Sequence, residues 1–177
     1  MIYLDNAATS FPKPPEVAEA ITDFLTHRAG NPGRSGHSRA LAAEAVVAET
    51  RRLLAALLGI QDPARLAFTL NATDALNLAM WGLLRAGDRV VTTSVEHNAV
   101  ARPLFALAER GVDVVRLPSA PDGTLDLDDL ERELRSAPTR LVVMTHASNV
   151  CGTILPIRAA AELAHRHGAL ILVDAAQ

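Results

Sequence analysis

From residue 65 onward, short apolar runs alternate with longer segments of helical periodicity, and this alternation limits the possible folds more than any other feature. The apolar runs predict strands at residues 65–70, 89–93, 112–117, 141–145 and 169–173. Helices are predicted at residues 73–85, 99–110, 127–135 and 157–167. Short apolar strands that alternate with helices form a mostly parallel sheet with helices on both faces. The sequence therefore predicts an α/β fold.

The first 64 residues follow another pattern. A proline-rich stretch reaches Pro15, and a helix is predicted at residues 16–28, with proline at its entrance where a missing N–H does no harm. A glycine-bearing loop at residues 30–37 leads to a long predicted helix at 39–58. Its apolar residues share one face at helical spacing: Val46, Leu53, Leu54 and Leu57.

Composition excludes several classes of function. The net charge is -3 without a basic stripe, so a nucleic acid partner is not expected. No apolar run approaches the ~18 residues that span a bilayer, and the start has no secretory signal. A single cysteine excludes an internal disulfide and favours a cytoplasmic location. We predict no membrane association and no metal site.

Polar residues follow four of the predicted strands. In parallel α/β sheets ligands bind beyond the carboxyl ends of the strands. Thr73 begins a helix that could hold an anion, His97 could stack on an aromatic ring or act as an acid or base, and Asn149 could bind a substituent. Asp174 could pair with a protonated ring nitrogen, with Gln177 nearby. Alone, these residues read as a helix cap, a loop histidine and a turn, but together they predict a cofactor site.

In this order and at these separations, the motifs resemble the class V aminotransferase family, in its cysteine desulfurase and selenocysteine lyase branch. The resemblance rests on residues 3–9, 33–37, 71–77, 96–98, 148–153 and 173–177. It implies a fold type I transferase that depends on pyridoxal 5'-phosphate (PLP). By this resemblance, residues 16–177 are an incomplete large PLP-binding domain, and residues 1–15 are a segment that lines the substrate side.

The resemblance also implies roles for single residues. Ala72 and Thr73 correspond to the loop that binds the phosphate of PLP. His97 corresponds to the catalytic imidazole that stacks on the pyridine ring. Asp174 corresponds to the partner of the ring nitrogen. The amides near the 3-oxygen of the ring correspond to Asn149 and Gln177.

Other implied residues are less specific or absent. Segments that line the substrate side correspond to Ala7, Ala8, Arg34 and His37. The family's Schiff-base lysine, catalytic cysteine and substrate-binding arginine are expected further along than Gln177. The chain's one lysine, Lys13, is interpreted as a solvated surface residue, and its one cysteine, Cys151, as a small buried residue. The 177 residues alone are therefore expected to be inactive and to bind PLP weakly.

The resemblance implies that the complete protein takes sulfur from L-cysteine, giving L-alanine and an enzyme persulfide. A homodimer and a sulfur-acceptor protein are expected partners. Three alternatives remain: another PLP reaction (aminotransferase, lyase or epimerase), a non-catalytic scaffold subunit, and a nucleotide-binding domain. The last ranks lowest because the Gly-x-Gly-x-x-Gly motif is missing after the first predicted strand.

Overall fold

The structure, a computed structural model, describes residues 2–33 and 36–177. The chain separates into two compact units, Met1–Phe68 and Thr69–Gln177. The second unit contains all four strands of the sheet, and the first contains only helices, turns and loops among its described residues. Each unit is therefore considered by itself.

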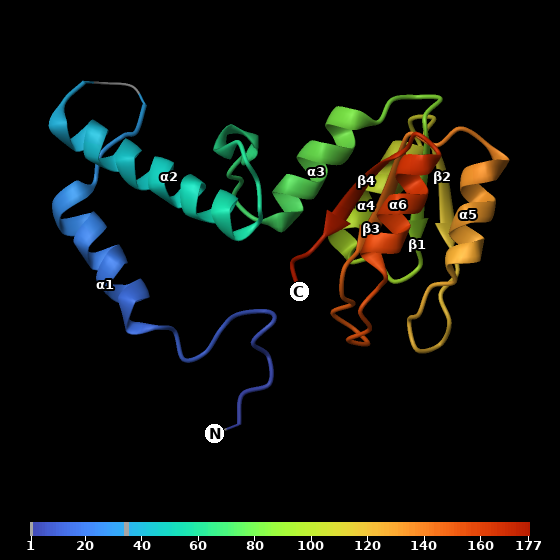
Figure 1. The fold of residues 1–177 in the computed structure, drawn as a ribbon, viewed down its shortest axis with the longest axis horizontal. Helices are drawn as coiled ribbons and strands as arrows, with labels where there is room; N and C mark the ends of the chain where they lie inside the picture. Colours follow the sequence, from blue (N-terminus) through green and yellow to red (C-terminus); the bar gives the residue numbers. More distant parts are fainter. Residues whose placement is uncertain (1, 34–35) are drawn as a thin grey trace. The chain divides into compact units, whose positions relative to one another are not determined.

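The second unit is built on a four-stranded parallel sheet (Figure 1). Its strands are β1 (Arg89–Thr93), β2 (Asp113–Leu117), β3 (Leu141–Thr145) and β4 (Leu170–Asp174). They lie in the order β2-β1-β3-β4, and each neighbouring pair is parallel. The two central strands are buried along their whole length, as expected for a sheet that is covered on both faces. The predicted parallel α/β fold is confirmed.

Helices cover both faces of this sheet. One layer consists of α3 (Ala72–Leu83) and α4 (Asn98–Ala108), and the other of α5 (Leu127–Ser136) and α6 (Ile157–Arg166). Successive side chains of a strand point to opposite faces. The core beneath α3 and α4 accordingly takes Val90, Leu141 and Val143. The core beneath α5 and α6 takes the residues next to them, Val91, Val142 and Met144.

The path of the chain reverses direction between the two central strands. From β1 the chain passes through α4 to β2, and from there through α5 to β3 on the other side of β1. It then continues through α6 to β4, away from β2. In open α/β sheets, the crevice at the carboxyl ends of the strands where the order reverses is the usual ligand site. The topology therefore points to the ends of β1 and β3.

The first unit contains two long helical segments. Helix α1 (Pro15–Asp23) continues into a π-helical turn, η1 (Phe24–Arg28), and α2 (Ser38–Leu57) follows the glycine-bearing loop. A short 3-10 turn, η2 (Pro63–Arg65), comes last. Both predicted helices are confirmed. The predicted apolar face of α2 is only partly covered in this structure, because Leu57 is 79% exposed.

The strand predicted at residues 65–70 is wrong. These residues form the end of η2 and then an irregular segment without strand pairing. Leu66 has extended backbone angles, but its carbonyl accepts a hydrogen bond from Nε of Arg51 (3.1 Å) and none from a strand. An apolar run gives a strand only when another strand supplies hydrogen-bond partners, and sequence periodicity carries no information about that partner.

Candidate active site

A cavity of about 250 Å³ lies at the carboxyl ends of the strands. Its walls come from the starts of α3 and α4 and from the chain that follows β3 and β4. The lining residues are Asn71, Ala72, Thr73, His97, Ala99, Thr145, Ala147, Asn149, Asp174, Ala176 and Gln177. Ligand pockets typically measure ~300–1,000 Å³, so this cavity suits a small ligand rather than a dinucleotide.

The structure brings all six predicted cofactor-binding residues into this one cavity. They are Ala72, Thr73, His97, Asn149, Asp174 and Gln177. They come from four segments that are far apart in the sequence, and each segment follows a strand or begins a helix. Their shared position shows that one ligand can contact them together, while the role of each residue in binding PLP stays a prediction.

The predicted substrate-side residues belong to the first unit. Ala7 and Ala8 lie in an exposed turn, which is stabilised by a hydrogen bond from the Tyr3 hydroxyl to the Thr9 carbonyl (2.8 Å). Nδ1 of His37 accepts a hydrogen bond from the backbone N–H of Ala40 (3.2 Å) and thereby caps α2. Arg34 lies outside the described residues. The substrate-side role of these four residues stays a prediction.

The first turn of α3 offers an anion site. Oδ1 of Asn71 caps the helix by accepting a hydrogen bond from the backbone N–H of Asp74 (2.9 Å). The backbone N–H groups of Ala72 and Thr73 come earlier in this turn, where no acceptor exists within a helix. Together with the Thr73 hydroxyl and the positive end of the helix dipole, they can bind a phosphate.

His97 caps α4, and this hydrogen bond determines which ring nitrogen carries the proton in the neutral imidazole. Nδ1 of His97 accepts a hydrogen bond from the backbone N–H of Ala99 (3.1 Å), so it carries no proton in this arrangement. In the neutral ring the proton is therefore on Nε2. The exposed ring can present an apolar face and an N–H donor to a ligand in the cavity.

A tight turn after β3 carries Asn149. The buried Ser148 stabilises this turn, because its Oγ accepts hydrogen bonds from the backbone N–H groups of Val150 (3.2 Å) and Cys151 (3.3 Å). Gly152 closes it by donating to the Ser148 carbonyl (2.9 Å), at a positive φ of 72° that favours glycine. Asn149 is consequently held at the cavity with an exposed side chain.

Asp174 is held in place by the sheet and by the chain that follows it. It is the last residue of β4 and pairs with Thr145 in the sheet, and its carbonyl accepts a hydrogen bond from His146 (2.8 Å). Oδ1 of its side chain accepts a hydrogen bond from the backbone N–H of Ala176 (3.1 Å). The residue is only 7% exposed. No ion pair to this carboxylate exists in the described part of the chain.

Glu96 is a further member of the site for which the sequence predicted no role. Its Oε1 accepts hydrogen bonds from the hydroxyl of Thr93 (2.6 Å) and from the backbone N–H of Thr145 (3.0 Å). Burial, with a smaller contribution from the charge of Asp174, raises the pKa of Glu96 to about 7. The available signal was its position beside His97, directly after a buried strand.

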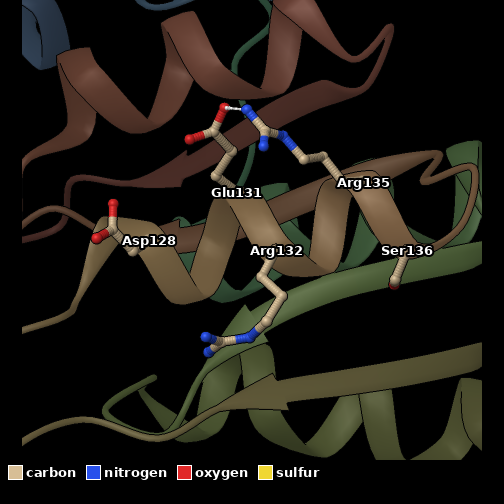
Figure 2. Close-up of a pocket in the computed structure, with 5 residues that line it drawn as sticks. All are labelled: Asp128, Glu131, Arg132, Arg135 and Ser136. Atoms are coloured by element: carbon tan, nitrogen blue, oxygen red, sulfur yellow. Dashed lines mark hydrogen bonds and ion pairs between the residues drawn. The ribbon is translucent and has the colours of Figure 1, made fainter.

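A second hollow, on the surface of α5, has a different character (Figure 2). It is lined by Asp128, Glu131, Arg132, Arg135 and Ser136, all from one helix. Figure 2 shows the ion pair between Glu131 and Arg135, whose oxygen and nitrogen lie 2.6 Å apart. Such pairs one turn apart on a helix are ordinary solvated surface features. The hollow lacks groups from other elements, so we assign no site to it.

Two reactive residue types lie outside the cavity lining. Nζ of the exposed Lys13 donates hydrogen bonds to Oγ1 of Thr9 (2.7 Å) and to the Ser10 carbonyl (2.6 Å) within the first unit.

Cys151 is exposed, so the expectation of a small buried residue is wrong. Hydrogen bonds with Ser148 and then Thr153 lower the pKa of its thiol to about 7. It belongs to the turn after β3, whose sharp bend keeps the side chain out of the core.

Two negative findings apply to residues 2–33 and 36–177. No cluster of three or more His, Cys, Asp or Glu side chains is arranged to hold a metal ion there. No helix in the same part of the chain has the length and apolar character needed to cross a membrane.

Comparison with known proteins identifies the family. The family model for aminotransferase class-V matches residues 2–177. The chain belongs to the class-V aminotransferase family.

The chain is also similar to individual members of this family. A probable cysteine desulfurase of Halobacterium salinarum is 39% identical over the whole chain, which covers 43% of that protein. The apo structure of a cysteine desulfurase from Thermococcus onnurineus superposes with a TM-score of 0.89 at 31% identity, over 98% of this chain and 44% of that one. A mutant of C-DES with glycine covalently linked to its PLP cofactor superposes with a TM-score of 0.82 at 27% identity, over 97% and 46%. The chain thus spans less than half the length of these relatives.

The cavity suits PLP, the group that the C-DES structure contains. A buried carboxylate without a cationic partner is costly, and a protonated ring nitrogen would neutralise Asp174. The first turn of α3 supplies donors for a phosphate, and the amides of Asn149 and Gln177 can bind a ring oxygen. The donors and acceptors of the cavity therefore match the anionic, cationic and hydroxyl parts of PLP.

Proposed function

We propose that this chain forms the cofactor-binding part of a PLP-dependent cysteine desulfurase. The proposed reaction takes sulfur from L-cysteine and gives L-alanine and an enzyme persulfide. One observation carries the proposal: six predicted cofactor residues from four separate segments line a single cavity, where the strand order reverses. The similarity to cysteine desulfurases over the whole chain supports it.

The proposed roles of the residues follow from their positions. Bound PLP supplies an electron-withdrawing ring that makes the bonds of an attached amino acid easier to break. Asp174 would keep the ring nitrogen protonated, since its carboxylate is buried at that end of the cavity. His97 would lie against the ring, with Nε2–H free to donate because Nδ1 is occupied by Ala99. Thr73 and the first turn of α3 would bind the phosphate.

The residues present determine what this chain can do alone. Residues 69–177 contain no lysine, so the unit with the cavity has no amine for a covalent link to PLP. We therefore propose that the purified chain of 177 residues binds PLP noncovalently and weakly, and that it releases no sulfide from L-cysteine.

Two measurements test these proposals. Titration of the chain with PLP, followed by absorbance, should show saturable binding that sodium borohydride does not make permanent. Sulfide release from L-cysteine should equal that of free PLP. Sulfide above that background would contradict the inactivity of the isolated chain, and absence of saturable PLP binding would contradict the proposed cofactor site.

A class-V aminotransferase, lyase or epimerase reaction is the second candidate, and the description of the matching family favours it. Product analysis of the complete protein with L-cysteine separates these reactions: desulfuration gives alanine, β-elimination gives pyruvate, transamination gives mercaptopyruvate and epimerisation gives D-cysteine. A non-catalytic scaffold would give none of these products.

The proposal extends to partners of the complete protein. The layer of α3 and α4 exposes large apolar side chains, namely Leu78 (64%), Trp81 (39%) and Phe105 (68%). Apolar surface of this kind supports a homodimer, which sedimentation of the complete protein would test. A sulfur-acceptor protein and a cytoplasmic location stay predictions.

A further inference from the structure

The carboxyl group of Glu96 connects the ends of the two central strands. Backbone pairing between β1 and β3 ends at Thr92 and Val143. Two residues further along, the backbone N–H of Thr145 donates to Oε1 of Glu96 instead (3.0 Å). The same oxygen accepts a hydrogen bond from the Thr93 hydroxyl at the end of β1 (2.6 Å). One side-chain oxygen thus continues the sheet where the backbone ladder stops.

This connection lies directly behind the wall of the cavity. Thr145 lines the cavity, and so does His97, which follows Glu96 in the chain. The side chain of Glu96 is itself absent from the lining and is partly buried, with Oε2 shielded from solvent. A group in this place can act on a ligand only through the residues that it holds. Loss of the connection would free Thr145 and the start of α4 to move relative to each other.

The surroundings of Glu96 favour its neutral form. Oε2 is buried and has no hydrogen-bond partner among the described residues. The groups that face the carboxyl are Thr93 from β1, Thr145 from β3 and Asp174 from β4, and of these only Asp174 carries a charge. A negative charge on Glu96 would be poorly solvated and repelled by Asp174. The pKa of Glu96, raised to about 7 mainly by burial, agrees with this geometry.

We propose that Glu96 is a positioning residue of the cavity, which as a neutral acid connects β1 to β3 and holds Thr145 and His97 in the cavity wall. As a consequence, no second carboxylate charge lies beside Asp174. The part that concerns PLP rests on the proposed function, whereas the connection between the strands does not.

Amide hydrogen exchange tests the connection without any cofactor. At a pH below 7, Glu96→Ala should speed exchange of the Thr145 amide about tenfold, because that N–H loses its acceptor. Glu96→Gln should leave the exchange rate within about twofold of the wild type, since its amide oxygen can accept both hydrogen bonds. The control is Glu109→Gln, which changes an exposed glutamate at the end of α4 and should alter nothing.

The affinity for PLP tests positioning. Glu96→Ala should raise the Kd for PLP about tenfold, and Glu96→Gln should restore the wild-type value because charge is not required. Equal weakening by both variants would overturn the neutral-acid role. Unchanged affinity and unchanged exchange in Glu96→Ala would overturn the proposal entirely. If the wild type binds no PLP, the proposed function fails, while the exchange rates still decide whether Glu96 connects the strands.

Two further measurements test the proposal even if the Glu96→Ala variant does not fold. Thr93→Val removes one donor to Oε1 with almost no change in shape, and it should speed Thr145 exchange by less than Glu96→Ala. Infrared difference spectra between wild type and Glu96→Gln should contain the carbonyl stretch of a protonated carboxyl group below pH 7. A spectrum with only carboxylate bands at that pH would contradict the neutral form.

Discussion

At the amino end of β1 the guanidinium of Arg89 is surrounded by acceptors, whereas at the carboxyl end of β4 the carboxylate of Asp174 faces a cavity. Arg89 donates to Oδ2 of Asp113 (3.2 Å), to Oγ1 of Thr139 (3.2 Å) and to both the carbonyl and the carboxylate of Glu133. Asp174 accepts one backbone hydrogen bond at its side chain and has no cation among the described residues. Both charges are buried, but only one is neutralised by the protein.

This difference separates a structural charge from a binding charge. A buried charge with a full set of partners stabilises one arrangement of the chain, and a ligand can gain nothing from it. A buried charge that lacks a partner costs folding free energy, and a ligand of opposite charge recovers that cost. Substitutions at the two ends should therefore act on different quantities, stability at one end and affinity at the other.

The largest effect on stability is expected for Arg89→Met. It removes the four hydrogen bonds of a buried guanidinium and should lower the free energy of unfolding by about 4 kcal/mol, at about 1 kcal/mol for each bond. Asp113 and Glu133 remain partly exposed, so solvent limits the cost of losing their cation. Urea denaturation measures the change. The control Arg132→Met, at an exposed pair on α5, should cost less than about 1 kcal/mol. If the folded Arg89→Met chain bound PLP more weakly than the wild type, the distinction between a structural charge at Arg89 and a binding charge at Asp174 would be contradicted.

The next largest effect concerns Glu96 and pH. Its pKa is about 7 in the folded chain against an ordinary value of 4.5, so between these values the folded chain holds a proton that the unfolded chain has lost. The stability that the protonated side chain of Glu96 contributes is fully present below pH 4.5 and is lost as the pH rises to 7. At about 1.4 kcal/mol per pKa unit, the loss is about 3 kcal/mol.

Glu96→Gln cannot ionise and should lack this dependence on pH. Urea denaturation of both chains from pH 4 to pH 8 would show the two stabilities diverge as the pH rises, with the variant above the wild type. Parallel curves would mean that Glu96 has an unshifted pKa in the folded chain.

A smaller effect, measured as a loss of affinity, is expected for Asp174→Asn. The amide keeps the size of the side chain but loses the charge that would pair with a protonated ring nitrogen. PLP binding should weaken about 30-fold, which corresponds to ~2 kcal/mol for a charge-assisted hydrogen bond. Absorbance titration with PLP gives the Kd. Asp129→Asn, on α5 and absent from the cavity lining, should bind PLP as the wild type does.

The smallest effect is expected for Thr73→Val at the start of α3. The hydroxyl is lost while the shape and the backbone N–H groups remain, so the Kd for PLP should rise about fivefold, or ~1 kcal/mol. Competition by inorganic phosphate should weaken in parallel, because the lost contact is to the phosphate. Thr22→Val in α1 is the matched control. A variant that binds PLP fully but no longer responds to phosphate would place the phosphate elsewhere.

The sequence predicted the regular part of the fold well, because the repeated burial of β1 and β3 leaves a local signal. Each of the four strands from β1 on lies within a residue of its predicted bounds. The false strand at 65–70 shows the limit of that signal, since apolar character marks burial and not a backbone partner. His97, Asn149 and Asp174 could be selected because topology sends the end of every strand to one edge of the sheet. Thr73 follows the false strand, and only its place at the start of a helix was a valid signal.

What the sequence could not predict depends on contacts between distant segments. The role of Glu96 requires the backbone of Thr145, which lies 49 residues away. The tautomer of His97 follows from the cap that it forms on α4, and a histidine in a loop gives no sign of this in the sequence. The exposure of Cys151 depends on the bend of the turn at Gly152, for which residue type alone was a poor guide.

The position of β4 has a consequence for motion. Among the described residues of this chain β4 pairs with β3 alone, and edge strands open locally at lower free energy than central ones. Asp174 is the last residue of β4, so the carboxylate is in place only while that end of the strand stays closed. A ligand that requires Asp174 must select the closed form, and in doing so it slows the fraying of β4. Ligand binding in the cavity and ordering of the carboxyl end of β4 are then coupled in a single equilibrium.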